Sequence, residues 1–76
     1  MDKHIEFLVN YIAKNNNIDS KEVDIESDIF EKLYLDSIGI FSLLVEIEDT
    51  FEKELGLDDI ASLDKYTIQN IAKLMK

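Results

Sequence analysis

Apolar residues near the start of the chain recur at intervals of three or four, which is the period of one face of an α-helix. This first apolar set is Ile5, Leu8, Val9 and Ile12. Acids at positions 2 and 6 suit a helix N-terminus, and the three asparagines over 15–17 suit its end. We therefore predict a helix over about residues 2–15.

A longer amphipathic pattern begins at residue 37. Its main apolar stripe falls on one helical arc and consists of Ile40, Leu43, Leu44, Ile47 and Phe51. We predict a core-facing helix over about 37–55, ended by Gly56, because glycine readily takes the left-handed conformation that stops a helix. A second apolar set lies roughly opposite, among acids, at Ile38, Phe41 and Val45. This face is either buried against the preceding loop or exposed as an apolar ridge with an acidic rim, a composition typical of docking surfaces.

The remaining segments supply a long connection and two further helices. Residues 18–36 are too long for an ordinary loop in a small domain, and their spaced apolar residues predict a segment pinned onto the core, with a short helical turn near 29–32. These apolar residues are Val23, Ile25, Ile29, Phe30 and Leu33. We expect a short helix over 58–63 and a last helix over 68–76 capped by Thr67. The inward residues of the last helix are Ile68, Ile71, Ala72 and Met75.

Composition agrees with a helical protein. The 76 residues include no proline and only two glycines, which argues against a turn-rich β architecture. The predicted fold is therefore all-α, a four-helix bundle with three longer helices and one short one, in a single domain over 1–76 that we expect to be monomeric. Because the chain has no cysteine, a disulfide framework and a thiolate metal site are excluded, and any working thiol must come from a cofactor.

The chain is strongly acidic. It has 17 acids, eight basic residues that are all lysine, and a formal net charge of −9, and 15 of the acids lie between Asp19 and Asp64. Such a surface repels nucleic acid. The acids serve either solubility or steering toward basic patches on partner enzymes. No stretch has the roughly 18 apolar residues of a membrane span and the N-terminus lacks a secretory pattern, so we expect a cytoplasmic protein.

One serine stands out at the start of the longer helix. Ser37 follows Asp36 in the sequence Leu35-Asp36-Ser37-Ile38, where a hydroxyl is open to solvent because the first helical turn has little packing above it. The same end of a helix favours a phosphate ester through the aligned peptide dipoles. The simpler interpretation is that Asp and Ser are only good helix caps.

The wider context resembles the acyl carrier protein family. Residues 28–38 have the family's acid, apolar pair and leucine before the serine, and residues 45–51 resemble its acidic second helix with a closing phenylalanine. The resemblance implies a four-helix carrier fold that is not itself an enzyme. It implies that Ser37 receives 4'-phosphopantetheine from coenzyme A through a magnesium-dependent phosphopantetheinyl transferase, while Asp36 fixes the loop, caps the helix and meets a basic or metal-bound group on that transferase. The cargo is then an acyl or aminoacyl group held as a thioester.

The resemblance also implies which enzymes dock and where. The expected partners are the transferase, an acyl- or aminoacyl-activating ligase, and synthases or transferases with basic docking patches. The implied partner-binding residues are Ile38, Phe41, Val45, Glu48, Asp49 and Glu52. An acyl chain is expected to slip between the second and third helices beside Leu44, Ile47 and Ile60.

Two departures from the family pattern bear on the loop and on the pathway. Leu33 and Tyr34 stand where the family usually has a glycine, which predicts a tighter or differently bent loop. Gly39 and Ser42 replace acids that are common in members serving fatty acid synthesis. Fatty acid synthesis is the default pathway, with polyketide or nonribosomal peptide synthesis and D-alanylation of teichoic acid close behind. A further alternative is an acidic interaction module that is never modified.

Catalysis and metal binding by the chain itself find little support. A nucleophilic Ser37 needs a base, and the only histidine, His4, is expected to be a solvent-exposed helix residue near the chain end. A calcium loop starting at Asp24 fails because Ile29 and Leu35 stand where glycine and glutamate are required. We therefore predict no catalytic residue and no metal site.

Overall fold

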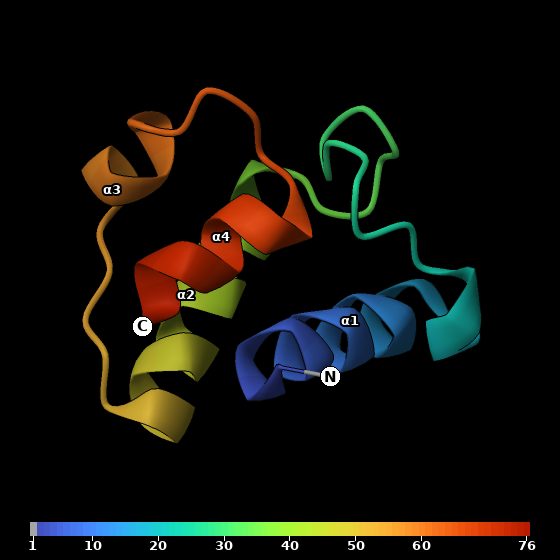
Figure 1. Cartoon of the computed structure of the whole chain (residues 1–76), viewed down its shortest axis with the longest axis horizontal. Coiled ribbons are helices and arrows are strands. Elements are labelled where there is room, and N and C mark those ends of the chain that lie inside the picture. The colour runs from blue at the N-terminus through green and yellow to red at the C-terminus, as the bar shows by residue number, and fades with distance from the viewer. Residues whose placement is uncertain (1) are drawn as a thin grey trace.

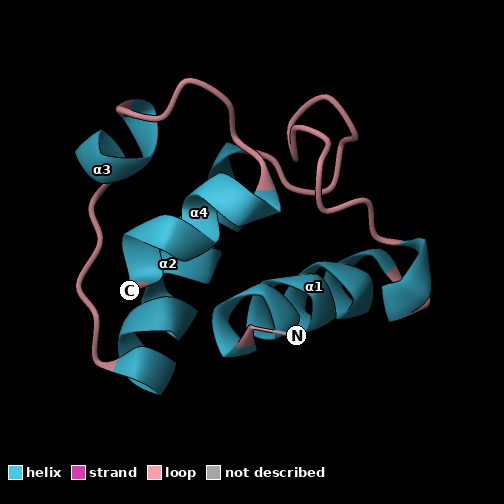
Figure 2. Ribbon diagram, in the orientation of Figure 1, coloured by secondary structure: helices cyan, strands magenta, loops and turns pink. Residues whose placement is uncertain are grey.

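Helices account for all the regular structure in the part of the chain that the computed structural model describes, residues 2–76 (Figures 1 and 2). In chain order the elements are α1 (Lys3–Asn16), the 3-10 turn η1 (Ser20–Glu22), α2 (Ser37–Phe51), α3 (Leu57–Ala61) and α4 (Ile68–Met75). The prediction of an all-α fold with three longer helices and one short helix is confirmed. The turn η1 was not expected from the apolar pattern, because it contributes no buried residue.

The ends of α1 follow from local chemistry. The Asp2 carboxylate accepts hydrogen bonds from the backbone N–H groups of His4 (2.7 Å) and Ile5 (3.3 Å), which satisfies donors that the first turn leaves unpaired. At the other end Asn17 takes the left-handed conformation (φ 56°). Asparagine tolerates that conformation better than most residues, so the predicted stop at the asparagine run is confirmed.

Helix α2 ends earlier than the predicted 37–55. Glu52 is left-handed (φ 55°), and its N–H donates to the Glu48 carbonyl at 2.9 Å. The Phe51 ring packs edge-on against Phe7 of α1, with ring centroids 5.1 Å apart. The helix thus stops where its last aromatic residue reaches α1, a tertiary contact that the local pattern does not encode.

Gly56 does not stop α2, and that prediction is wrong. It precedes α3 with an extended conformation (φ −101°, ψ 171°), and its N–H donates to the Asp59 carboxylate at 2.8 Å. The segment between α2 and α3 is an open connection, and a second loop leads from α3 to α4 (Figure 1). Helix α4 begins as predicted, because the Thr67 hydroxyl accepts from the Asn70 N–H at 3.1 Å.

The long connection between α1 and α2 is held against the start of α4. The Asp28 carboxylate accepts from the N–H groups of Phe30 (2.8 Å), Glu31 (3.2 Å) and Tyr66 (3.1 Å). The Ile29 N–H donates to the Tyr66 carbonyl at 2.9 Å, and residues 28 and 67 form an isolated antiparallel bridge. These bonds join segments 38 residues apart, so the predicted pinning of the connection is confirmed.

The core draws on every helix and on the connection. Helix α1 packs against α4, and Lys76 Nζ lies 2.8 Å from an Asp2 carboxylate oxygen, which brings the two chain ends together. The buried apolar residues are Leu8, Val9, Ile12, Ala13, Val23, Ile29, Leu35, Ile40, Leu43, Leu44, Ile47, Ile60, Ile68, Ile71, Ala72 and Met75. The expected inward stripes of α2 and α4 are therefore confirmed, except that Phe51 is only half-buried.

Candidate functional site

Ser37 is the first residue of α2 and is exposed to solvent. The residue before it, Asp36, is the N-cap, and its carboxylate accepts the Gly39 N–H at 2.7 Å. No hydrogen bond within residues 2–76 uses the Ser37 hydroxyl. Asp36 therefore performs the capping role that the sequence suggested, and Ser37 itself caps nothing.

The electrostatics of this helix end favour an added phosphate. Within the described residues, the backbone N–H groups of Ser37 and Ile38 have no hydrogen-bond partner, and the first turn of α2 contains no acid. Such N–H groups carry the positive end of the helix dipole. A phosphate ester on the Ser37 oxygen would lie beside these donors, so the residues present fit a phosphate-linked group.

The loop before Ser37 is closed by Leu33 in an unusual conformation. The Leu33 N–H donates to the Phe30 carbonyl (3.1 Å) and the Tyr34 N–H to the Ile29 carbonyl (2.9 Å), with Leu33 left-handed at φ 58°. This is the bond pattern with which a helical turn commonly ends, usually through a glycine. The predicted helical turn near 29–32 is present, but Leu33 is 84% exposed. The prediction that Leu33 helps to pin the connection to the core is wrong, because a left-handed residue here turns its side chain outward.

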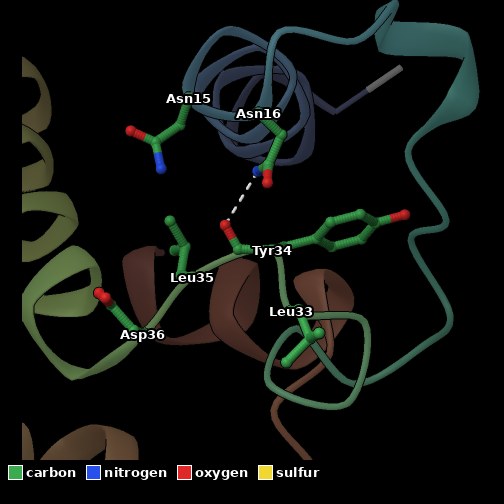
Figure 3. A pocket seen from close by; sticks show the side chains of 6 residues that line it. All are labelled: Asn15, Asn16, Leu33, Tyr34, Leu35 and Asp36. Carbon is green, nitrogen blue, oxygen red and sulfur yellow. Dashed lines mark hydrogen bonds between the residues drawn. The ribbon is translucent and has the colours of Figure 1, made fainter.

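The backbone just before Ser37 is fixed to α1. The Asn16 side chain donates to the carbonyls of Ile12 and Tyr34, both at 2.9 Å. Figure 3 shows the second of these bonds. The Leu35 side chain is buried in the core. These two contacts position the Asp36–Ser37 segment, and Asn16 gave no sequence signal beyond its place in an asparagine run.

Two acids earlier in the connection between α1 and α2 also take part in hydrogen bonds. Burial raises the pKa of Asp28, but the N–H groups of Tyr66, Glu31 and Phe30 outweigh it, so the pKa lies below its ordinary value. The Ser27 hydroxyl and the Glu26 N–H lower the pKa of Asp24, whose own N–H donates to the Tyr34 hydroxyl at 3.1 Å. Both carboxylates are therefore ionised structural acceptors near neutral pH.

His4 lies far from Ser37. Its side chain is only 14% exposed, its ring lies 5.0 Å from the Phe51 ring, and Nδ1 lies 3.1 Å from the Asp2 carboxylate. The prediction of a solvent-exposed His4 is wrong, because the start of α1 packs against the end of α2. Phe51 lies fourteen positions after Ser37 on the same helix, or about 21 Å away at the helical rise. His4 therefore cannot act as a base for Ser37.

The second apolar stripe of α2 is exposed, which decides between the two interpretations of that face. The exposed fractions are 76% for Ile38, 53% for Phe41 and 58% for Val45. Glu48, Asp49 and Glu52 are exposed as well. We call these six residues the α2 ridge. A docking role for the ridge remains a prediction.

The residues expected to receive an acyl chain lie inside the core. Leu44, Ile47 and Ile60 are all buried.

Among residues 2–76, no three His, Cys, Asp or Glu side chains are arranged to hold a metal ion. Across the same residues, no helix is long and apolar enough to cross a membrane.

Comparisons with known proteins point to one family. Residues 6–75 match the family described as phosphopantetheine attachment site. The chain is similar to the "Probable acyl carrier protein" of Caulobacter vibrioides, with 37% identity over 71% of this chain and 60% of that protein. It is also similar to the "Acyl carrier protein" of Phaeodactylum tricornutum, with 29% identity over 91% of this chain and 88% of that protein.

A third relative is the "Acyl carrier protein" of Phytoplasma mali, with 38% identity over 60% of this chain and 55% of that protein. The matches to the Caulobacter and Phytoplasma proteins thus span less than two thirds of their lengths. No solved structure gave a significant match.

Proposed function

Because the chain belongs to the phosphopantetheine attachment site family, we propose that it is an acyl carrier and that Ser37 holds the 4'-phosphopantetheine prosthetic group of that family. The observation that carries the proposal is the position of the Ser37 hydroxyl, which is exposed, free of hydrogen bonds to described residues and placed at the N-terminus of α2. When attached, the group supplies a terminal thiol that holds an acyl or aminoacyl cargo as a thioester.

In this proposal the chain is the acceptor and a phosphopantetheinyl transferase is the catalyst. The Ser37 oxygen forms a bond to the phosphorus next to the pantetheine half of coenzyme A, the bond to the nucleotide half breaks, and the hydroxyl proton leaves. Since His4 lies at the opposite end of α2 and Asp36 serves as the helix cap, we expect the transferase to supply the base. Ser37 holds the resulting phosphodiester beside the free N–H groups of the first turn.

The α2 ridge is the surface proposed to meet partner enzymes. Its three apolar side chains begin one residue after Ser37, and the three acids follow toward the end of the same helix. Helix α2 contains no basic residue, so its field attracts basic patches such as those expected on a transferase, a ligase or a synthase. The apolar part would supply contact area and the acids would supply orientation.

Several biosynthetic pathways fit a carrier with this sequence. Fatty acid synthesis stays the default, while Gly39 and Ser42 in place of acids favour the polyketide, nonribosomal peptide and D-alanyl alternatives. A Cβ at Gly39 would lie 3.2 Å from the Asp36 carboxylate oxygen and 3.2 Å from the Leu35 side chain. A side chain at 39 would crowd the cap before Ser37, so the geometry of the cap also favours glycine at this position.

The attachment is tested by co-expression with a broad-specificity phosphopantetheinyl transferase, followed by intact mass measurement. The wild type should gain the mass of one phosphopantetheine, and Ser37→Ala should gain nothing. Ser42→Ala is the matched control, because Ser42 is also exposed on α2. An unmodified wild type, or equal modification of Ser37→Ala, would overturn the assignment.

The Ser37→Ala variant also distinguishes a serine that carries the arm from a serine that only stabilises the fold. Because Asp36 and not Ser37 caps α2, Ser37→Ala should change the free energy of unfolding by less than about 0.5 kcal/mol. Asp36→Ala should lower it by about 0.5–2 kcal/mol, as cap removals do. An acidic module that never needs modification would keep its biological role in Ser37→Ala, whereas a carrier would lose it.

A further inference from the structure

A cavity lies directly beside the proposed attachment residue. It has a volume of about 320 Å³, between the end of α1 and the segment that precedes Ser37 (Figure 3). Its lining residues are Asn15, Asn16, Leu33, Tyr34, Leu35 and Asp36. The volume falls within the range of about 300–1,000 Å³ that is usual for small-molecule sites. Since Asp36 is in the wall, the cavity begins one residue from Ser37.

Several hydrogen-bonding groups of this wall have no partner among the described residues. Among residues 2–76, no hydrogen bond uses the Asn15 side chain or the backbone N–H groups of Leu35 and Asp36. Figure 3 shows the Asn15 amide turned toward Leu35 and Asp36. The neighbouring Asn16 NH2 group, in contrast, donates to two carbonyls, which ties that side of the wall to both α1 and the loop. Free groups on a fixed wall are available to a ligand that carries amides.

The chemistry of the cavity matches the pantetheine part of the arm. That part contains two secondary amides, which donate and accept hydrogen bonds, and a branched aliphatic segment. The Asn15 amide can both donate and accept, the free N–H groups can donate, and the exposed Leu33 side chain offers an apolar surface. Asn15 also lines a second cavity of about 410 Å³, with Tyr11, Lys14 and Glu46. Asn15 thus lies at the boundary of both cavities.

We propose that this Asn15 cavity is a resting site for the pantetheine arm when no enzyme is bound, with the Asn15 amide holding an amide of the arm. The inference rests on the proposed attachment at Ser37. The resting site lies between α1 and the loop before α2, and its lining does not include the buried Leu44, Ile47 and Ile60. A docking enzyme would have to release the arm from this site before using the thiol.

The test is nuclear magnetic resonance on isotopically labelled protein carrying the unlabelled arm. We expect nuclear Overhauser effects between arm protons and the side chains of Asn15 and Leu33, together with shifts of the Leu35 and Asp36 amide signals relative to the unmodified protein. Arm signals as sharp as those of free pantetheine, without contacts to these residues, would overturn the proposal. Contacts only to α2 and α3 would overturn it equally.

Two matched variants test whether the arm contacts depend on the Asn15 side chain. Asn15→Ala removes the free amide, and Asn10→Ala makes the same change at another exposed position of α1. We expect the arm contacts to be lost in Asn15→Ala and kept in Asn10→Ala, with both variants still taking up the arm. Equal contacts in the two variants would overturn the proposal. Failure to take up the arm at all would instead overturn the attachment at Ser37, and the mass spectrum distinguishes that result.

Discussion

Leu33 holds a backbone conformation that belongs more naturally to glycine. Its φ of 58° lies in the left-handed region, which costs an L-residue roughly 1–2 kcal/mol because Cβ approaches the neighbouring carbonyl. The side chain is largely exposed, so burial does not offset that strain. Leu33 is therefore a residue whose replacement by glycine should stabilise the protein.

We expect Leu33→Gly to raise the free energy of unfolding by about 0.5 kcal/mol, since relief of the strain exceeds the greater backbone entropy that glycine loses on folding. The measurement is urea denaturation of the unmodified protein. Leu33→Ala is the control, because alanine keeps Cβ and the strain. A glycine variant no more stable than the alanine variant would show that Leu33 is unstrained in solution.

Some residues of the candidate site could be recognised from the sequence alone, and others could not. Ser37 and Asp36 were found because capping and helix-end chemistry are local and visible in four residues. Asn16 was missed, because its bond to the Tyr34 carbonyl joins residues 18 apart. His4 was misplaced for the same reason, since its burial depends on the Phe51 ring. Nothing in either local sequence contains that information.

The elements differ in how far their limits could be predicted. The start of α1 and the start of α4 could be predicted from the capping side chains of Asp2 and Thr67, and the end of α1 from Asn17, which takes the left-handed conformation. The end of α2 did not, because residues 52–55 continue a helix-compatible sequence and only the packing of Phe51 against α1 shows where the helix stops. A helix end that is set by a nearby capping residue can thus be predicted from the sequence. A helix end that coincides with a tertiary contact cannot.

The connection between α1 and α2 depends on one carboxylate for its attachment to α4. Asp28 accepts three backbone N–H groups, one of them from Tyr66, and the net effect is a pKa below the ordinary value of 3.8. A carboxylate whose pKa is lower in the folded state than in the unfolded state stabilises the fold at pH values above its unfolded pKa. That contribution is lost as the pH falls below 3.8 through the lower folded pKa.

We expect Asp28→Ala to lower the free energy of unfolding at neutral pH by about 2 kcal/mol, because the part-buried N–H of Tyr66 loses its acceptor and the turn after residue 28 loses its cap. The variant should also lose less stability than the wild type on acidification. Denaturation at neutral pH and near pH 3 measures both effects. Glu26→Gln, at an exposed neighbouring position, is the control, and an equal loss of stability in the two variants would contradict the assigned role of Asp28.

For the whole molecule, the bundle leaves one long face of α2 uncovered. The inward stripe of this helix is buried in the shared core, while the α2 ridge stays open from Ile38 to Glu52. The sequence predicted both stripes, but it left open whether the connection covers the second one. The structure shows that the connection is anchored to the start of α4 instead. An exposed apolar ridge with acids on the same helix therefore lies next to the proposed attachment serine.

The ridge can be tested without altering Ser37. We expect Phe41→Ser to lower kcat/KM for modification by a phosphopantetheinyl transferase about tenfold, because an aromatic side chain in the middle of an interface commonly contributes more than 1 kcal/mol. Stability should change little, since Phe41 is half-exposed. Leu57→Ser is the matched control, because Leu57 is a similarly exposed apolar residue outside the ridge. The wild-type rate should also fall at high salt, as expected for an encounter that the net charge of −9 assists. Equal rates for the two variants would place the docking surface elsewhere and leave the exposed apolar face of α2 without a partner.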